Sequence, residues 1–369
     1  MLYRPFGSTG IDVSAIGFGG MRFEFIDDEE ACASLVKSAH ERGINYFDTA
    51  PAYFEGRSEE RFGLAFSEMK KTRAERPFYV SSKTTAAEPD QVRRDLERSL
   101  ERMGLDALDF YYVWWVAHPK SYFDRKARGA LEAFTRLKEE GLIKHVVLSS
   151  HMSGVESEEV LADYPFEGVL IGYSAMNFTY RQRTLEAAAR GGRGVVVMNP
   201  LGGGIIPQHV ERFDFLRTRD DESVVEASLR FLLATPEIQV VLVGLGNQQH
   251  LEEAISAVDG FEGVSEAQMA RIRERLVTSF DQMCTGCGYC DTCPEDLPIP
   301  RLMQSFNERL FSDEPKKVIN ALRFAHGIYP EGHHVDQCTE CGQCEEVCTQ
   351  SLPIIGRLKL IQHEIEQHG

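Results

Sequence analysis

Long apolar runs are missing from this sequence of 369 residues, and basic residues are scarce. No stretch reaches the roughly 18 apolar residues of a membrane-spanning helix, and the N-terminus, Met-Leu-Tyr-Arg-Pro, begins no apolar run of signal-peptide length. Lysine and arginine number 40 against 57 aspartates and glutamates, which gives a net charge of −17. Such an acidic chain is repelled by nucleic acid and by anionic membranes. We therefore expect a cytoplasmic protein with neither as a partner.

Cysteine is nearly absent from the first 280 residues, where Cys32 stands alone in a helical pattern. The other eight cysteines lie between Cys284 and Cys348. In a reducing compartment, this clustering favours metal ligands over disulfides. The length suits a barrel of roughly 250 residues plus a smaller domain. We therefore expect two domains, residues 1–280 and 281–369.

Short apolar runs alternate with amphipathic segments through the first domain, after a hairpin that turns at Ser8-Thr9-Gly10. Eight strand–helix units favour a closed barrel over an open doubly wound sheet, with right-handed parallel crossovers. The predicted strands are 14–18, 44–48, 78–82, 108–115, 145–149, 168–171, 194–198 and 240–243. The predicted helices are 27–42, 58–69, 89–103, 127–140, 153–161, 180–190, 222–233 and 248–258, with another at 265–283.

Ionisable residues stand where two of these strands end. Asp48 closes the strand 44–48, because the following Thr-Ala-Pro cannot continue a central strand. Tyr53 lies in the loop beyond it, and Lys83 ends the strand at 78–82 in the same way. Strand ends of this kind converge on one mouth of a β/α barrel. We therefore expect these three side chains to meet.

Together, the three side chains suggest proton chemistry. A free tyrosine has a pKa of about 10. A nearby ammonium lowers the pKa of the phenol, and a carboxylate paired with that ammonium holds it in place. Asp48, Tyr53 and Lys83 could then protonate a carbonyl oxygen while a hydride arrives at carbon. The alternative from the residues alone is a solvated loop tyrosine beside a structural ion pair.

The run Phe47-Asp48-Thr49-Ala50, with Tyr53, Gly56, Ser58-Glu59-Glu60 and Gly63, resembles the signature of the aldo/keto reductase family. Three further runs also resemble sequences of this family: 7–14 (GSTGIDVS), 17–20 (GFGG) and 200–204 (PLGGG). The resemblance covers residues 1–280 and implies a (β/α)8 TIM barrel that uses a nicotinamide cofactor on a small carbonyl or alcohol substrate. It places Asp48, Tyr53 and Lys83 in three positions of a catalytic tetrad.

The fourth tetrad position, a histidine in the family, is occupied here by Trp114. An indole donates one hydrogen bond but cannot relay a proton. The nearest histidine is His118, which either swings back into the mouth or is a surface loop residue. Trp114 and Trp115 are the only tryptophans, and they either pack in the core or form a wall of the substrate site.

The resemblance also implies a dinucleotide site on the loops after the later strands, where a helix N-terminus suits phosphate. The run 246–250 (GNQQH) has no lysine or arginine where NADP-using members hold the 2′-phosphate. Either NAD is used, or His250 and neutral donors suffice for NADP, or no nicotinamide binds; no preference for NADP is expected. The implied contacts are Ser149 and Ser150 at the carboxamide, Pro200, Leu201 and Gly202 along the pyrophosphate, and Gly244, Gly246, His250 and Glu253 on the adenosine side.

The clustered cysteines form the runs C-x2-C-x2-C-x2-C-P and C-x2-C-x2-C-x3-C. A zinc ribbon uses isolated CxxC pairs, whereas successive two-residue gaps suit 4Fe-4S clusters; zinc is the less favoured alternative. The runs resemble bacterial two-cluster ferredoxins, in which the last cysteine of each run ligates the other cluster. The short gap before Cys293, and Thr349 in place of proline, depart from that pattern. The implied ligand sets are Cys284, Cys287, Cys290 and Cys348, and Cys338, Cys341, Cys344 and Cys293.

Helical stretches at 299–310 and 315–326 complete the expectation of a mostly α-helical, ferredoxin-like C-terminal domain. Three hypotheses follow. The first is a nicotinamide-dependent carbonyl reductase or alcohol dehydrogenase, whose clusters serve structure or exchange electrons with a ferredoxin or another redox protein. The second is a one-electron iron–sulfur reductase that works without nicotinamide, and the third is a non-catalytic electron-transfer module. No flavin motif connects one-electron clusters to hydride chemistry.

Overall fold

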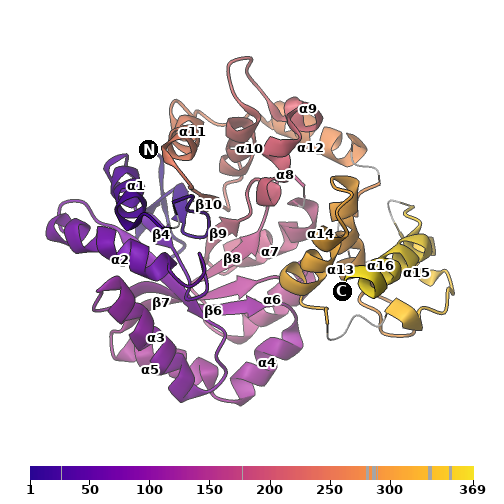
Figure 1. The fold of residues 1–369 in the computed structure, drawn as a ribbon, viewed down its shortest axis with the longest axis horizontal. Coiled ribbons are helices and arrows are strands. Elements are labelled where there is room, and N and C mark those ends of the chain that lie inside the picture. Colours follow the sequence, from indigo (N-terminus) through magenta and orange to yellow (C-terminus); the bar gives the residue numbers. More distant parts are fainter. Residues whose placement is uncertain are drawn as a thin grey trace.

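The structure is a computed structural model that describes residues 1–25, 27–176, 178–279, 282–284, 288, 290–330, 335–348 and 351–369. Eight parallel strands form a closed barrel, in the order β10-β3-β4-β5-β6-β7-β8-β9 (Figure 1). The closed (β/α)8 barrel predicted from the sequence is thereby confirmed. The strands are β3 (Ile16–Gly19), β4 (Tyr46–Asp48), β5 (Tyr79–Thr84), β6 (Leu108–Val116), β7 (Ile143–Ser150), β8 (Gly168–Gly172), β9 (Gly194–Met198) and β10 (Val240–Gly244).

Most predicted helices match within a few residues, and three further helices were not predicted. The helix predicted at 127–140 is α5, which begins at Ala130. A separate helix, α4, precedes it, because Pro119 stands at the start of a helix, a position that proline favours. Two short helices, α8 and α9, follow the glycines after β9. The barrel helices are α1 (Glu29–Glu41), α2 (Ser58–Met69), α3 (Pro89–Met103), α4 (Pro119–Ala127), α5 (Ala130–Glu139), α6 (Gly154–Asp163), α7 (Phe178–Arg190), α8 (Ile205–Gln208), α9 (Val210–Phe213), α10 (Val224–Leu233), α11 (Gln248–Val258) and α12 (Glu266–Ser279).

The N-terminal hairpin closes one end of the barrel. Strands β1 (Tyr3–Pro5) and β2 (Asp12–Ser14) pair antiparallel, and Phe6 follows β1. Phe6 is fully buried among inward-facing barrel residues, including Tyr46 and Phe110. With this end filled by aromatic side chains, the opposite end, at the C-terminal ends of the strands, is the one available for chemistry.

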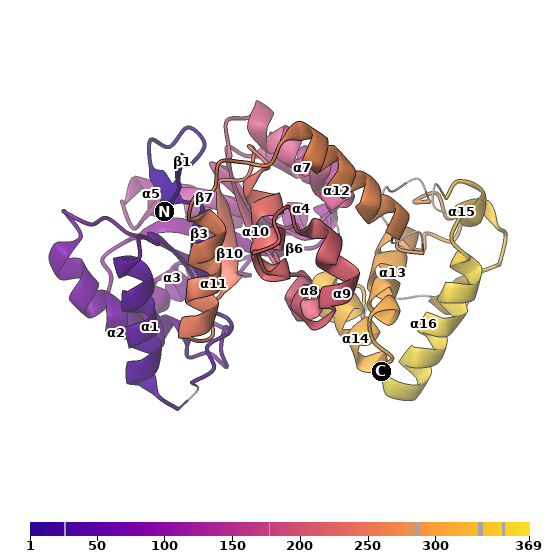
Figure 2. The ribbon, with the colours of Figure 1, turned by 90° about the horizontal axis from the view of Figure 1, so that it is seen from above.

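The C-terminal region packs beside the barrel as a small helical layer. Its helices are α13 (Ile299–Phe306), α14 (Pro315–Asn320), α15 (Gln343–Glu346) and α16 (Ile354–His368), and a π-helical turn, η5 (Ala321–Ala325), continues α14. In two perpendicular views, α13 and α14 lie between the barrel and α16 (Figures 1 and 2). Leu302, Leu322 and Ile354 are part of a separate core that also holds Cys290 and Cys344. Within the described residues, no helix combines the length and the apolar character needed to cross a membrane.

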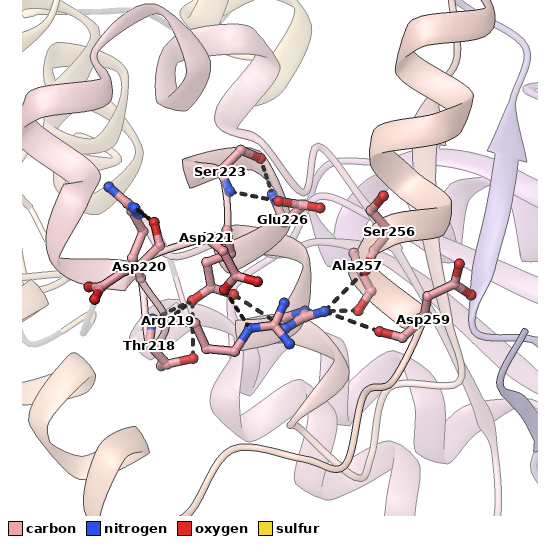
Figure 3. A network of polar contacts seen from close by, with 12 residues as sticks. Thr218, Arg219, Asp220, Asp221, Ser223, Glu226, Ser256, Ala257 and Asp259 are labelled. Carbon is pink, nitrogen blue, oxygen red and sulfur yellow. Dashed lines mark hydrogen bonds and ion pairs between the residues drawn. The ribbon is translucent and has the colours of Figure 1, made fainter.

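A buried arginine joins α10 to α11, the helix expected at the adenosine side. Arg230 donates to the backbone oxygens of Ala257, Ser256 and Asp259 at 3.1, 3.1 and 3.3 Å (Figure 3). Its guanidinium also lies 3.5 Å from Glu222, and both side chains are almost completely buried. Because these contacts satisfy the last carbonyl groups of α11, they hold that helix in place from its C-terminal end.

We expect Arg230→Met to lower the free energy of unfolding by roughly 3–5 kcal/mol, because it leaves Glu222 buried without its cation. Denaturant unfolding measures the change. Arg219→Met is the matched control: Arg219 pairs with Asp221 at 3.4 Å on the surface, where an ion pair contributes about 0–1 kcal/mol. Equal losses in the two variants would contradict a special role for the buried pair.

Candidate active site and cysteine centre

A buried ion pair forms the base of the barrel mouth. Lys83 Nζ lies 2.6 Å from Asp48 Oδ1 and donates to the carbonyl oxygen of Thr49 at 2.7 Å. The Lys83 side chain is completely buried. Burial lowers the pKa of Lys83, and the Asp48 carboxylate works against that shift. The meeting of Asp48 and Lys83 predicted from the strand ends is therefore observed.

Three further residues surround this pair, and the sequence analysis did not identify them. Ser81 donates to Asp48 Oδ1 at 2.6 Å. Lys83 Nζ lies 4.9 Å from the ring centroid of Tyr112, whose hydroxyl is hydrogen-bonded to that of Tyr46. The alternation of side chains along a strand could have identified Ser81, because Ser81 and Lys83 are two residues apart on β5 and therefore lie on the same, inner face.

Tyr53 lies above Lys83 in a different arrangement from the one expected. Lys83 Nζ faces the Tyr53 ring, 4.8 Å from its centroid. Burial raises the pKa of Tyr53 well above its usual value, and Asp48 acts in the same direction. The expectation that Lys83 lowers this pKa is therefore not met, because the ammonium charge is already paired with Asp48. Tyr53 is accordingly a neutral hydroxyl at neutral pH.

The two candidates for the fourth tetrad position occupy different places. Trp114 packs edge-on against Tyr53, with ring centroids 5.8 Å apart, and so forms a wall beside the phenol. His118 caps α4, where its Nδ1 accepts a hydrogen bond from the Ser121 amide at 3.1 Å. Burial lowers the pKa of His118, and Arg301 of the C-terminal region acts in the same direction. A catalytic contribution from His118 stays a prediction.

The two serines that end β7 differ in their surroundings. Ser149 lies two residues beyond Val147, which faces the barrel interior, so it shares that inner face. Its Oγ is buried and has no hydrogen-bond partner among the described residues. Ser150 Oγ is instead hydrogen-bonded to Ser157 of α6 at 2.8 Å. An orphaned hydroxyl at this position fits the carboxamide of a nicotinamide, so Ser149 suits the expected role and the Ser150 side chain does not.

The pyrophosphate-side loop follows β9 directly. Pro200 is buried, and Leu201 packs against the barrel core. The glycines from Gly202 to Gly204 all have positive φ and lead into α8. Gly202 has φ of +62°, a conformation that glycine adopts without strain, and an added Cβ would lie 2.5 Å from Met176 Sδ.

On the adenosine side, an acidic residue from the loop after β3 packs against the start of α11. Glu24 Oε2 accepts a hydrogen bond from Asn247, the residue that caps α11, at 2.8 Å, and a Cβ on Gly246 would lie 3.0 Å from Glu24 Oε1. His250 donates its amide to Asn247, and its Nδ1 accepts from the Gly246 amide at 3.3 Å. Gly244 ends β10, and Glu253, one turn into α11, accepts from Gln249. A carboxylate thus lies at the start of the helix where the resemblance places the adenosine side of a dinucleotide.

One hollow in the C-terminal region is lined by four cysteines from both runs. These four cysteines are the ones that the resemblance assigned to one cluster, namely Cys293, Cys338, Cys341 and Cys344. Leu297, Ile299 and Leu358 supply apolar walls. Four thiols around one space are the donor set of a 4Fe-4S cluster.

Three cysteines of the other implied ligand set, Cys284, Cys290 and Cys348, lie within the described residues. Burial lowers the pKa of Arg357, while Cys284 and Cys348 both act to raise it, so one guanidinium lies near both. The Cys284 amide donates to Asn307 Oδ1, at the end of α13, at 2.8 Å, and Asn307 Nδ2 donates to the Cys284 carbonyl oxygen at 2.9 Å. Cys290 is buried in the same core, and Cys287 lies outside the described residues. The described members are consistent with the implied set.

Comparison with known proteins supports both parts of the chain. Residues 15–276 match the aldo/keto reductase family, and residues 283–352 match a 4Fe-4S dicluster domain. L-galactose dehydrogenase of Arabidopsis thaliana is 26% identical over 294 residues, 72% of this chain and 90% of the relative. An NADH-specific methylglyoxal reductase of Escherichia coli is 25% identical over 230 residues, 56% of this chain and 70% of the relative.

Among solved structures, the holo form of an aldo-keto reductase from Bacillus halodurans has a similar fold, with a TM-score of 0.63 at 22% identity. The alignment covers 75% of this chain and 96% of that one. The family match spans more than half of the sequence and coincides with the barrel that carries Asp48, Tyr53 and Lys83. The chain belongs to the aldo/keto reductase family and is an oxidoreductase that carries a 4Fe-4S dicluster domain.

Proposed function

We propose that this protein transfers hydride between a nicotinamide dinucleotide and a small carbonyl or alcohol at the mouth of its barrel, with Tyr53 as proton donor and acceptor. The observation that carries this proposal is the buried Asp48–Lys83 pair, with the Tyr53 ring 4.8 Å from Lys83 Nζ. A bound nicotinamide would supply the hydride, which the chain's own side chains cannot.

The residues of the mouth divide the remaining work. Tyr53, whose pKa is raised by burial, stays neutral and donates its proton to the developing alkoxide. Lys83 keeps a positive charge beneath the ring, and this charge offsets the negative charge left on the phenol oxygen. Asp48 and Ser81 hold Lys83 in position. Ser149 is the proposed partner of the carboxamide.

The C-terminal region is proposed to hold two 4Fe-4S clusters, one in the hollow lined by Cys293, Cys338, Cys341 and Cys344. The other would be held by Cys284, Cys287, Cys290 and Cys348. When bound, the clusters carry single electrons, and a ferredoxin or another redox protein is the proposed exchange partner. The boundary near residue 280 and the cytoplasmic location stay predictions.

A second candidate function has one observation in its favour. Trp115, next to Trp114 in the mouth, donates its indole N–H to Phe324 O of the C-terminal region at 3.0 Å. This contact would suit direct one-electron delivery from the clusters to a substrate in the barrel, without nicotinamide. An anaerobic titration with NADH and NADPH separates the candidates: the hydride proposal fails if neither dinucleotide binds at millimolar concentration.

We expect Tyr53→Phe to lower turnover of a carbonyl substrate by about 10² or more, because general acid catalysis contributes on that scale. Affinity for the dinucleotide should stay nearly unchanged. Tyr79→Phe is the matched control, since Tyr79 begins β5 at the other end from Lys83. An unchanged rate in the Tyr53 variant would remove this residue from the mechanism.

Anaerobically prepared protein should contain about eight iron and eight sulfide per chain. Because metal binding is coupled to folding, Cys341→Ser should make the region after residue 280 sensitive to protease while the barrel stays intact. Cys32→Ala, in the barrel core, serves as the control and should retain full iron content. About four iron per chain would mean that one cysteine run holds no cluster, and stoichiometric zinc would contradict the assignment.

We expect NAD to bind at least as tightly as NADP at pH 8. A 2′-phosphate would meet the Glu24 carboxylate at the start of α11 and no lysine or arginine in the run 246–250. Each missing charge-assisted hydrogen bond lowers affinity by about 10- to 150-fold. The relative from Escherichia coli that is named NADH-specific shows that NAD use occurs among similar proteins.

Glu24→Gln tests the cause of this preference. Removing one carboxylate should tighten NADP binding by roughly fivefold relative to NAD at low salt, the scale of a screened charge contact. Glu30→Gln, an exposed position on α1, is the matched loss of one negative charge and should change neither constant. NADP binding that is a hundredfold tighter in the unmodified protein would show that cations from elsewhere reach the phosphate.

A further inference from the structure

The two tryptophans lie at an irregular point of β6. The pairing of β6 with β7 shifts register between Val113 and Val116, and Trp115 has a left-handed backbone, with φ of +56°. This bulge turns adjacent side chains toward different neighbours. Trp114 packs against Tyr53, and Trp115 reaches the C-terminal region. Bulges of this kind commonly re-aim a side chain beside an active site.

The left-handed conformation is unfavourable for a bulky residue and persists only where its surroundings impose it. The C-terminal region supplies such surroundings. The indole N–H of Trp115 donates to Phe324 O at 3.0 Å. Gly327 packs so closely that an added Cβ would lie 3.0 Å from Ala117 Cβ and 3.6 Å from Trp115 Cζ2. Gly327 itself has φ of +64°, so the close approach depends on glycine.

Neighbouring contacts hold the same two parts together. His151, which follows β7, shares a hydrogen bond of 3.2 Å between its Nδ1 and Ala325 O, and its amide donates to Val116 O at 2.8 Å. Arg301 of α13 pairs with Glu156 of α6 at 2.6 Å. The turn at 324–327 is therefore fixed against the ends of β6 and β7, on either side of the bulge.

We propose that Trp115 is a positioning residue, which uses the docked C-terminal region to set Trp114 against Tyr53. When the turn at 324–327 contacts Trp115, the bulge in β6 is fixed and Trp114 packs against the Tyr53 ring. When that contact is lost, β6 relaxes at the bulge and Trp114 no longer confines Tyr53. The inference rests on the proposed role of Tyr53. Under this proposal Trp114, which occupies the family's histidine position, positions Tyr53 and does not relay a proton.

The experiment uses the chain's two tryptophans as reporters. Holoprotein labelled with 5-fluorotryptophan should give two 19F resonances, because the sequence has two tryptophans. Tyr53→Phe should shift the resonance of Trp114, which packs against Tyr53, and so assigns both resonances. Trp115→Phe leaves the Trp114 resonance alone in the spectrum. The perturbing variant is Gly327→Ala, which adds a methyl group at the junction and touches no proposed cluster ligand or tetrad member.

Gly260→Ala is the matched control. Gly260 has nearly the same φ as Gly327, +63° against +64°, and nothing lies within 4 Å of an added Cβ. Both variants therefore carry an alanine at the same positive φ. They differ in the contacts that the methyl group at position 327 makes with Ala117 and Trp115. Iron content and thermal unfolding, measured on each sample, establish that the clusters and the fold are retained.

We expect Gly327→Ala to shift or broaden both resonances and to lower kcat for carbonyl reduction about tenfold with little change in dinucleotide affinity. Gly260→Ala should do neither. Should Gly327→Ala fail to fold, Trp115→Phe must displace the remaining Trp114 resonance and lower kcat similarly. A change confined to the Trp115 resonance, with kcat unaltered, would overturn the inference. If Tyr53→Phe leaves turnover unchanged, the proposed function fails, and the resonances still decide whether the junction moves Trp114.

Discussion

The buried pair of Asp48 and Lys83 is the interaction on which the candidate site depends. A lysine removed from water strongly favours its neutral form unless an anion lies against it. Asp48 provides that anion at 2.6 Å, and Ser81 and the carbonyl of Thr49 fix the geometry. The pair can form because β4 and β5 are neighbours: Asp48, the last residue of β4, lies opposite Ser81, and Lys83 follows two residues farther along β5. The barrel topology thus places the paired charges of Asp48 and Lys83 directly beneath the Tyr53 ring.

The C-terminal region adds a second constraint from the opposite direction. It contacts Trp115 at the end of β6, His151 directly after β7 and Glu156 in the first turn of α6. A domain that only stored electrons would have no need to contact Trp115, which has a left-handed backbone and directly follows the tryptophan that packs against Tyr53. The contacts therefore favour a joint role for the barrel and the C-terminal region, in which the position of the cysteine-bearing region affects the shape of the proposed substrate site.

Local sequence signals were sufficient for some features. Asp48, Tyr53 and Lys83 could be found because each lies at or just after a strand end. The two cysteine runs could be found because their spacing is nearly periodic, and their division into ligand sets came from the resemblance to ferredoxins. Two serines in a row, by contrast, could not be told apart until β7 showed that Ser149 faces inward and Ser150 faces α6. Glu24 at the start of α11 and Trp115 on Phe324 were also out of reach. These contacts join residues more than 200 positions apart, and no local pattern encodes such distances.

The central claim is that hydride, and not single electrons, reaches the substrate. Single-turnover reduction of methylglyoxal and other small aldehydes with NADH deuterated at the transferring carbon tests it directly, under anaerobic conditions and with cluster absorbance followed throughout. The account predicts one deuterium on the reduced carbon of the product and constant cluster absorbance during the turnover. Product without deuterium, formed while the cluster absorbance changes in step, would contradict it and establish one-electron delivery.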